Sequence, residues 1–331
     1  MTNIIQMTKT ILLLLVSILF FGCNANRSTL VENVASPKAD NHQHLFSKEM
    51  ADFQKIQPVH ASDVIGFLDD AGINKAVVLS TAYSYGRPER EPANEYEMVK
   101  AENDFVAEQA SQFPGRLKAF CSFNPLKDYA IDELERCANR PDSWAGIKMH
   151  FGNSDVQLEN PEHVEKLKKV FSAANKNKMP IVIHMRASIS KNRPYGSEQA
   201  RIFLEQLLPI AQDIPIQIAH LAASGPGYVD TASYQVIDTF IEALKNNPKA
   251  TKQLWFDIAT VGVRQNDEAT SLLLADKIRK IGVDRILYGS DASVGQNPNL
   301  LPKESWEAFC KTGLTRNELN IIANNVAPYL R

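Results

Sequence analysis

The sequence predicts a single α/β domain with the architecture of a (β/α)8 TIM barrel, and three observations lead to this prediction. From Ala39 onward, short apolar runs alternate with amphipathic stretches of helical length, as expected for repeated βα units around a parallel sheet. Eight such units follow one another, and one barrel can hold them all because α/β barrels commonly use about 250 residues as a single domain. No glycine-rich dinucleotide fingerprint follows the first strand, which argues against an open doubly wound sheet.

Each predicted strand is a short apolar run that is rich in β-branched or aromatic residues. The strands are expected at Ala39–Leu45, Lys75–Thr81, Leu117–Asn124, Ala145–Phe151, Pro180–Arg186, Pro215–Ala222, Leu254–Val261 and Arg285–Ser290. The helical periodicity between them predicts helices at Ala61–Ala71, Glu95–Gln112, Pro161–Asn177, Ser197–Gln212, Ser233–Asn246 and Ala269–Ile281. A last helix, Arg316–Leu330, is expected to close the outside of the barrel.

The longer connections follow the carboxyl ends of strands one, two, five and eight, where barrel enzymes assemble their sites. They carry aromatic and basic side chains that could recognise a substrate, including Tyr83, Arg87 and Arg193. The charge balance of 36 basic and 38 acidic side chains gives a net charge of -2. This balance provides no strong positive field, so nucleic-acid binding is not expected as the main function.

The first 37 residues are expected to lie outside the fold. Lys9 precedes an uncharged apolar run, Ile11–Phe21, which Gly22 and Cys23 follow directly. The run is short for a membrane span, and the arrangement resembles a bacterial lipoprotein signal, although Phe20 stands where Leu is usual. We therefore expect a signal over residues 1–23 with Cys23 as the lipidated residue, a polar tether over 24–37 and the barrel over 38–331.

This signal predicts an exported protein that is attached to a bacterial membrane through its N-terminal lipid only, on the periplasmic side or the cell surface. A plain membrane anchor or a cleaved signal with an incidental cysteine remains the alternative, and the start could lie at Met1 or Met7. The other cysteines, Cys121, Cys137 and Cys310, have no metal-type spacing. They are expected to be buried small hydrophobic residues rather than a disulfide framework.

The strongest local motif is Asp40-Asn41-His42-Gln43-His44 in the first strand. Residues two apart on a strand point the same way, so both imidazoles can face one metal ion. Three more polar residues end apolar runs: His184 in strand five, His220 in strand six and Asp291 after strand eight. Each alone could be a buried histidine with a backbone partner or a helix cap, but together they predict a metal site.

At these residues the chain resembles the amidohydrolase superfamily, in particular the Amidohydrolase 2 group that includes aminocarboxymuconate-semialdehyde decarboxylase and dicarboxylate lactonases. The resemblance rests on the His42 and His44 pair, His184, His220, the Tyr-Gly-Ser-Asp segment ending at Asp291, and the closing Asn-Val-Ala-Pro-Tyr-Leu. It implies that His42, His44, His184 and Asp291 bind one divalent ion, with zinc expected. It also implies that Asp291 activates water and that His220 polarises the substrate.

The resulting prediction is a metal-dependent hydrolase that cleaves an ester, lactone or amide of a small carbonyl compound. A bound divalent ion lowers the pKa of water towards about 7, and Asp291 can accept the proton as that water attacks. The same metal site could serve a non-oxidative decarboxylase or another lyase, which is the alternative. A non-catalytic binding lipoprotein is a third hypothesis.

Three further residues are candidates for binding a substrate, possibly one that bears a carboxylate. Lys148 and His150 share one face of strand four and could point into the barrel. A strand-four lysine carries a carbamate between two metals in related hydrolases, but we favour a substrate or carboxylate contact and therefore one metal ion. Arg186 lies two residues beyond His184 and could clamp a carboxylate or form a rim ion pair.

Overall fold

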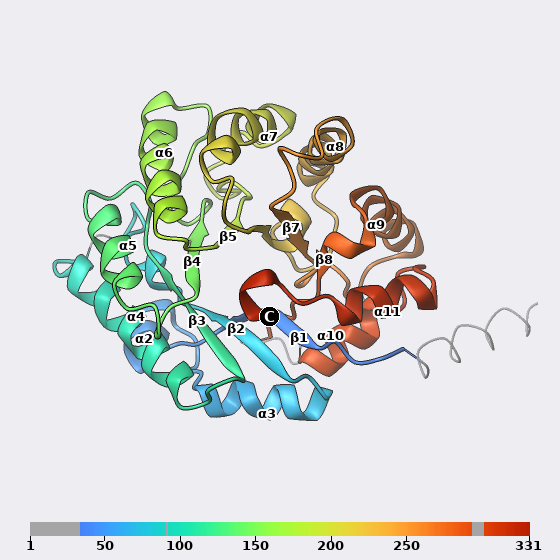
Figure 1. Ribbon diagram of the computed structural model, residues 1–331, viewed down its shortest axis with the longest axis horizontal. Coiled ribbons are helices and arrows are strands. Elements are labelled where there is room, and N and C mark those ends of the chain that lie inside the picture. Colours follow the sequence, from blue (N-terminus) through green and yellow to red (C-terminus); the bar gives the residue numbers. More distant parts are fainter. Residues whose placement is uncertain (1–33, 91, 293–300) are drawn as a thin grey trace, which may run out of the picture.

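The computed structural model describes residues 34–90, 92–292 and 301–331. Its eight parallel strands pair in the order β1 to β8. The backbone closes the ring between β8 and β1, because Asn41 N donates to Tyr288 O and Asp291 N donates to His42 O, each at 2.8 Å. The predicted (β/α)8 barrel is therefore confirmed (Figure 1).

The strands are shorter than the sequence suggested, mainly at their carboxyl ends. They are β1 Ala39–His44, β2 Lys75–Leu79, β3 Leu117–Ser122, β4 Gly146–His150, β5 Ile181–His184, β6 Ile216–Ile218, β7 Leu254–Asp257 and β8 Ile286–Leu287. Each start lies within one residue of its prediction, because apolar character begins there abruptly. The ends differ because the chain leaves the ladder early to form loops; at His220, for example, φ is +55°.

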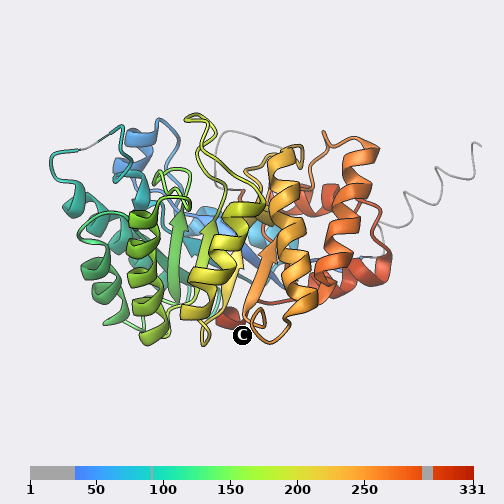
Figure 2. The same ribbon diagram turned by 90° about the horizontal axis from the view of Figure 1, so that it is seen from above.

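Helices surround the barrel, and Figure 2 shows the loops that follow the strands at one end and the C-terminus at the other. The α-helices are α2 Lys48–Gln54, α3 Ala61–Ala71, α4 Glu95–Ser111, α5 Ala130–Ala138, α6 Pro161–Lys176, α7 Ser197–Ile202, α8 Thr231–Asn246, α9 Glu268–Ile281, α10 Pro302–Phe309 and α11 Arg316–Asn324. Local sequence sets several boundaries: Thr315 and Glu318 form a capping box at α11, and Gly72 ends α3 in the left-handed conformation.

Two predicted helices are interrupted. The segment predicted as Ser197–Gln212 is α only to Ile202, continues as the π-helical segment η2, Phe203–Leu207, and ends in a short 3-10 turn that contains Pro209. The segment predicted as Arg316–Leu330 is α-helical only to Asn324, and the short 3-10 turn η7, Pro328–Leu330, follows it. Proline lacks a backbone donor and resists helix interiors, which accounts for the break before Pro328.

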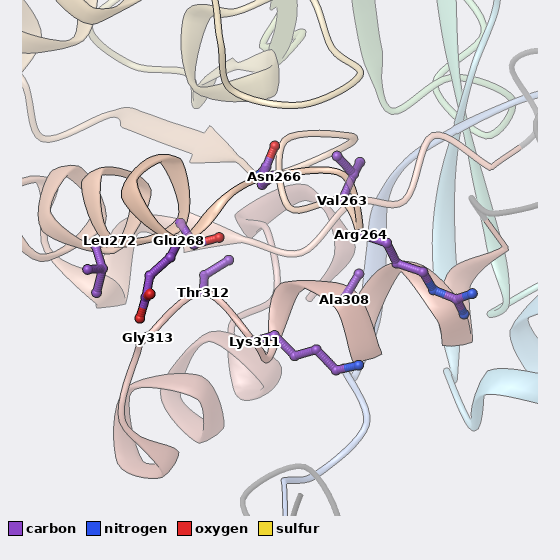
Figure 3. Close-up of a pocket in the computed structure, with 10 residues that line it drawn as sticks. Val263, Arg264, Asn266, Glu268, Leu272, Ala308, Lys311, Thr312 and Gly313 are labelled. Atoms are coloured by element: carbon purple, nitrogen blue, oxygen red, sulfur yellow. The ribbon is translucent and has the colours of Figure 1, made fainter. Parts of the chain in front are cut away.

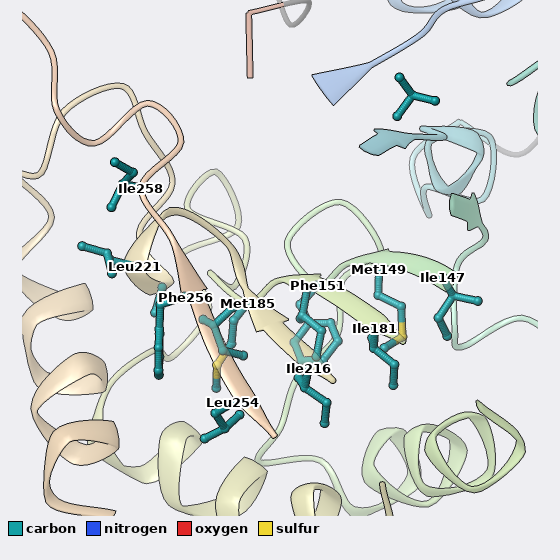
Figure 4. Close-up of a cluster of buried hydrophobic side chains, with 14 of the residues drawn as sticks. Ile147, Met149, Phe151, Ile181, Met185, Ile216, Leu221, Leu254, Phe256 and Ile258 are labelled. Carbon is teal, nitrogen blue, oxygen red and sulfur yellow. The ribbon is translucent and has the colours of Figure 1, made fainter. Parts of the chain in front are cut away.

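The core has two parts. Outward-facing side chains of the strands pack against the helices, as Figure 4 shows for residues of β4 to β7 such as Ile147, Met149 and Phe256. A smaller cluster, which includes Val77, Phe120, Val182 and Leu330, forms apart from this main core. On β4 the alternation leaves Lys148 and His150 on the other face from Ile147 and Met149, as the sequence predicted.

The predicted signal, Cys23 and most of the predicted tether lie outside the described residues. The last tether residues, from Val34, run along the barrel without helix or strand, and Ala35 N donates to Asn320 Oδ1. Cys121, Cys137 and Cys310 are buried and free, as predicted. Among the residues that the structure describes, none of the helices has the length and apolar character needed to cross a bilayer.

Candidate metal centre

The predicted site residues meet at the carboxyl ends of the strands. His42, His220 and Asp291 each offer one ligand atom, and these atoms lie within 4.8 Å of one another. His44 Nε2 lies 3.5 Å from Asp291 Oδ1. The sequence placed His220 just outside the coordination sphere, whereas the structure brings its ring among the closest donors.

The three histidines present the same nitrogen to the centre. Nδ1 of His44 contacts Leu79 O at 2.7 Å, and Nδ1 of His220 contacts Ala259 O at 2.8 Å. Nδ1 of His42 contacts Asp257 Oδ2 at 3.0 Å. Because a carbonyl or carboxylate oxygen can only accept, each Nδ1 carries the proton and each Nε2 is unprotonated and keeps its lone pair. This is the tautomer that binds a metal ion through Nε2.

The imidazoles are also neutral in this environment. Burial, with a further effect of the Lys148 charge, lowers the pKa of His42 to about 3. Burial likewise lowers the pKa of His44 and of His184 well below the ordinary value, and that of His220 below it. Neutral imidazole is the form that binds a metal ion, so the electrostatics fit a cation site.

Asp291 supplies the feature that tests this fit most directly. Its Oδ1 atom is buried and has no hydrogen-bond partner among the described residues, a costly state unless something else satisfies it. Burial raises the pKa of Asp291 well above its ordinary value even though Lys148 is near. A carboxylate oxygen beside three available imidazole nitrogens fits a divalent transition metal, with zinc among the suitable ions.

The backbone around the centre is locally strained to bring these groups together. Asp291 has a φ of +55°, and His220 and Leu221 lie in the same left-handed region, which L-residues adopt at a cost. Gly289 permits the close approach of β8 and β1, because a Cβ atom there would lie 2.7 Å from His42 Cβ. The Tyr-Gly-Ser-Asp segment therefore needs glycine at position 289 because His42 lies so close, and it needs a left-handed backbone at Asp291.

His184 and His150 form the next layer of the site. Their rings stack with centroids 3.8 Å apart, and the His184 ring lies 5.0 Å from that of His220. Asn153 N donates to His150 Nδ1 at 3.1 Å, so Nε2 of a neutral His150 carries the proton and can donate. The ring of Tyr83 lies 5.0 Å from His150. Contact of His150 with a substrate stays a prediction.

Lys148 and Arg186 have different surroundings. Lys148 Nζ is buried 3.4 Å from His42 Nε2, and burial lowers the pKa of Lys148 to about 8. Arg186 Nε donates to Asp230 Oδ2 at 2.5 Å, and its guanidinium lies 4.7 Å from the Tyr195 ring centroid. Arg186 thus already has a carboxylate partner, and its contact with a substrate stays a prediction.

Sequence reasoning missed Asp257, the last residue of β7. It is fully buried, accepts from His42 Nδ1, and also accepts from His220 N at 2.8 Å. Burial opposes its ionisation, but the His42 and His220 contacts prevail and lower the pKa of Asp257. An aspartate within the apolar run Leu-Trp-Phe-Asp-Ile was the available signal, because such a burial is costly without polar partners.

A separate cavity of about 200 Å³ lies between the loop before α9 and the end of α10, near Asn266, Leu272 and Lys311 (Figure 3). None of the predicted site residues lines it. The chemistry-bearing groups are those at the strand ends.

Comparison with known proteins agrees with this geometry. A family model described as amidohydrolase matches residues 40–318, which is most of the chain. The chain belongs to the amidohydrolase family. The family, together with the candidate metal centre, identifies this amidohydrolase as an enzyme. No curated protein matched the sequence.

Solved structures share the amidohydrolase fold at low identity. A 2,6-dihydroxybenzoate decarboxylase from Rhizobium is 17% identical with a TM-score of 0.59, covering 88% of this chain and 97% of its own. A dihydroxybenzoic acid decarboxylase from a Polaromonas species, with bound manganese and the inhibitor 2-nitroresorcinol, is 17% identical with a TM-score of 0.57, covering 88% and 95%. A probable 2-pyrone-4,6-dicarboxylic acid hydrolase from Acinetobacter baumannii, with citric acid bound, is 17% identical with a TM-score of 0.56, covering 86% and 95%.

Proposed function

We propose that this amidohydrolase is a metal-dependent decarboxylase of a small carboxylate-bearing substrate that binds at the carboxyl ends of the strands. The proposal rests on the surroundings of Lys148. Its ammonium group is buried beside His42, and no ion pair satisfies it among the described residues. The charges of Asp257 and Asp291 act on this ammonium group without forming an ion pair with it, and a buried charge that is not paired is costly, so an anionic substrate group is the natural partner for Lys148.

The metal ligands proposed are His42, His44, His220 and Asp291, with His184 alongside. When bound, the ion would act as a Lewis acid towards a substrate oxygen. Zinc is the ion expected from the sequence, and manganese occurs in one related decarboxylase. Both ions therefore belong in a test of the protein.

The side chains can then be given roles in the reaction. During decarboxylation, the bond to the carboxyl carbon breaks, its electron pair stays on the substrate carbon, and that carbon takes up a proton as carbon dioxide leaves. Asp291 is suited to move this proton because its Oδ1 makes no hydrogen bond among the described residues. Lys148 would hold the anionic group in place, and the Nε2–H group of His150 could donate to a substrate oxygen.

The comparisons support decarboxylation more than the hydrolysis that the sequence placed first. Two of the three similar structures described above are decarboxylases of hydroxylated benzoates. The names of all three include a carboxylic acid or its anion. A hydroxylated aromatic acid is therefore our first choice of substrate class.

Hydrolysis of a carboxylate-bearing lactone or ester is the second candidate. The relative described as a pyrone dicarboxylic acid hydrolase has the same fold. The same Asp291, whose Oδ2 lies 4.0 Å from His220 Nε2, could take a proton from an attacking water, and the Nε2–H group of His150 could donate to a carbonyl oxygen. The two reactions thus place different demands on one set of residues.

The deciding experiment is a substrate panel assayed on full-length protein loaded with zinc or with manganese. Hydroxylated benzoates and related acids are monitored for release of carbon dioxide, and lactones and esters for acid release at constant pH. We expect metal-dependent carbon dioxide release from at least one acid. Turnover of lactones or esters without carbon dioxide release would replace the proposal by the hydrolase alternative.

A further inference from the structure

Asp257 organises the floor of the metal centre through four hydrogen bonds. Its Oδ2 atom accepts from His42 Nδ1 at 3.0 Å and from Gln217 Nε2 at 2.6 Å. Its Oδ1 atom accepts from His220 N at 2.8 Å and from Ala259 N at 3.1 Å. One carboxylate therefore contacts both the ring of His42 and the backbone of His220.

These contacts determine how two histidines meet the centre. Acceptance from His42 Nδ1 keeps the proton on that nitrogen and leaves Nε2 free to bind a metal ion. Acceptance from the His220 amide holds the backbone where His220 adopts its left-handed conformation. Without this acceptor, the strained segment after β6 would lose one of the contacts that stabilise it.

Gln217 connects Asp257 to the opposite end of the barrel. Its Nε2 donates to Asp257 Oδ2 and also to Asn41 O at 3.0 Å. Its Oε1 accepts a hydrogen bond from the Tyr329 hydroxyl group. A side-chain amide has donors on one side and an acceptor on the other, so the Tyr329 contact favours the orientation in which Gln217 donates to Asp257.

Tyr329 belongs to η7, the short turn that follows α11, and this end of the chain lies at one end of the barrel axis (Figures 1 and 2). Its ring packs on Phe120 with centroids 4.8 Å apart. Ala327 N donates to Asn41 Oδ1 at 3.2 Å. Burial and the Asp257 charge raise the pKa of Tyr329 well above its ordinary value, so the phenol keeps its proton and can donate.

We propose that Asp257 is a positioning residue for His42 and His220, and that Tyr329 of the C-terminal turn acts through Gln217 to position Asp257. The proposal rests on the metal centre of the proposed function but not on the reaction that the enzyme performs. It assigns the C-terminal turn a role in metal affinity in addition to its packing against Phe120.

The test uses full-length Asp257→Asn and Tyr329→Phe proteins, with zinc affinity measured by competition with a chelator. The Asp257→Asn substitution would replace one acceptor by a donor, and we expect a roughly 10- to 100-fold loss of zinc affinity. Tyr329→Phe removes only the hydroxyl group, and loss of one hydrogen bond predicts a roughly 2- to 10-fold weaker affinity. Thermal unfolding with and without zinc provides the second readout.

Thr251→Val is the matched control, because Thr251 is buried before the start of β7 and its hydroxyl donates to Asn247 O at 2.9 Å. It also loses one buried hydroxyl bond, but it does not touch Asp257, Gln217 or Tyr329. We expect it to lower the melting temperature of the zinc-free protein while leaving zinc affinity unchanged. Tyr329→Phe should instead reduce the increase in melting temperature that zinc produces.

A double variant tests whether Tyr329 acts through Asp257. In the Asp257→Asn background, Tyr329→Phe should change zinc affinity by less than it does alone, because coupled residues are not additive. Parental zinc affinity in Tyr329→Phe would overturn the relay even if Asp257→Asn cannot be purified, and a parent that binds neither zinc nor manganese would overturn both proposals. Zinc binding without decarboxylation would overturn only the proposed reaction.

Discussion

In the proposed mechanism, the Asp291 side chain serves both metal binding and proton transfer. Its Oδ1 atom has no hydrogen-bond partner among the described residues, while Oδ2 lies 4.0 Å from His220 Nε2. An amide at this position keeps the shape and one oxygen ligand but cannot carry a transferable proton. The two functions of Asp291 can therefore be separated by a single substitution.

We predict that Asp291→Asn folds, keeps most of its metal and is nearly inactive. The histidines should still hold the ion, whereas general acid–base contributions are typically about 100- to 10,000-fold. Metal content and turnover of the best substrate are measured on the same preparation. Retention of more than about a tenth of the parental rate would contradict this role and would direct attention to His220.

Lys148 poses a different question, because a lysine on this strand could carry a carbamate that bridges two metals. We predict that Lys148→Met leaves about one metal ion per chain and raises KM for an acidic substrate, since the ammonium group that binds the anion is lost. Metal analysis and steady-state kinetics measure both effects. Two ions in the parent and none in the variant would show that Lys148 is a metal bridge.

The residues of the site differed in how visible they were in the sequence. His184 and His220 end apolar runs in a predicted barrel, and His42 and His44 lie two residues apart on its first strand, so the parallel strands place all four at one mouth. Asp257 could not be recognised in this way, because it was read as part of a longer strand, Leu254–Val261. Its importance depends on contacts with β1 and β6 that only the closed barrel creates.

At the level of elements, α2 and α4 are joined by an unusual buried carboxyl group. Glu102 of α4 contacts the hydroxyl group of Ser47, the N-cap residue of α2, and Ser47 N donates to Glu102 Oε1 at 3.3 Å. Burial raises the pKa of Glu102 to about 7 from an ordinary value of about 4.5, in spite of the Ser47 contacts. The folded state therefore binds this proton more tightly than the unfolded chain.

The sign of the resulting pH dependence follows from linkage. The unfolded chain loses this proton near pH 4.5, whereas the folded protein keeps it until about pH 7. The stabilisation is therefore fully present below pH 4.5 and is lost as the pH rises through 7. The loss amounts to about 3 kcal/mol of unfolding free energy. Glu102→Gln cannot ionise and should lack this component in urea titrations at pH 5 and 7.5. Glu108→Gln, an exposed change on the same helix, is the control, and an equal slope in parent and Glu102→Gln would refute the assignment.

The first residue of β4 shows how one glycine permits packing inside the barrel. A Cβ atom at Gly146 would lie 2.4 Å from the Phe120 ring and 2.6 Å from Pro180 O. We predict that Gly146→Ala destabilises the fold by about 1–3 kcal/mol, as overpacking commonly does. Denaturant unfolding measures this. Gly66→Ala in α3, where nothing lies within 4 Å, should be neutral or slightly stabilising, and a similar loss there would argue against a steric cause.

The ends of elements were the least predictable part of the fold, and the reasons are local. The start of β6 followed from its apolar residues, but its end did not, because Ala219–Ala222 form a short turn with left-handed His220 and Leu221. The C-terminal helix was predicted to reach Leu330, yet the chain turns at Asn325 so that Tyr329 can reach Gln217. Tertiary contacts thus override the helical pattern where the chain approaches the barrel floor.

On the scale of the whole molecule, the barrel places its chemistry and its chain ends in different regions. The candidate metal centre lies at the carboxyl ends of the strands, whereas Figure 2 shows the C-terminus at the opposite end. The segment from Val34 enters along the outside, where Trp306 Nε1 donates to Ala35 O at 3.1 Å. An N-terminal anchor attached to this segment would therefore be separate from the candidate metal centre, whose residues all belong to the barrel.

The anchor itself is predicted from Gly22-Cys23, which follows the apolar run Ile11–Phe21 directly. One acyl chain holds a protein at a membrane only weakly, so stable attachment needs more than one chain. We predict that Cys23 carries lipid in the mature protein and that Cys23→Ser moves the protein from the membrane fraction to the soluble fraction. Because the barrel begins well after this position, metal content per folded chain should stay the same. Mass spectrometry of the N-terminal peptide from membrane extracts detects the modification. An unmodified Cys23 in the mature native protein, or unchanged membrane association of Cys23→Ser, would show that the apolar run serves as a plain anchor or an ordinary cleaved signal.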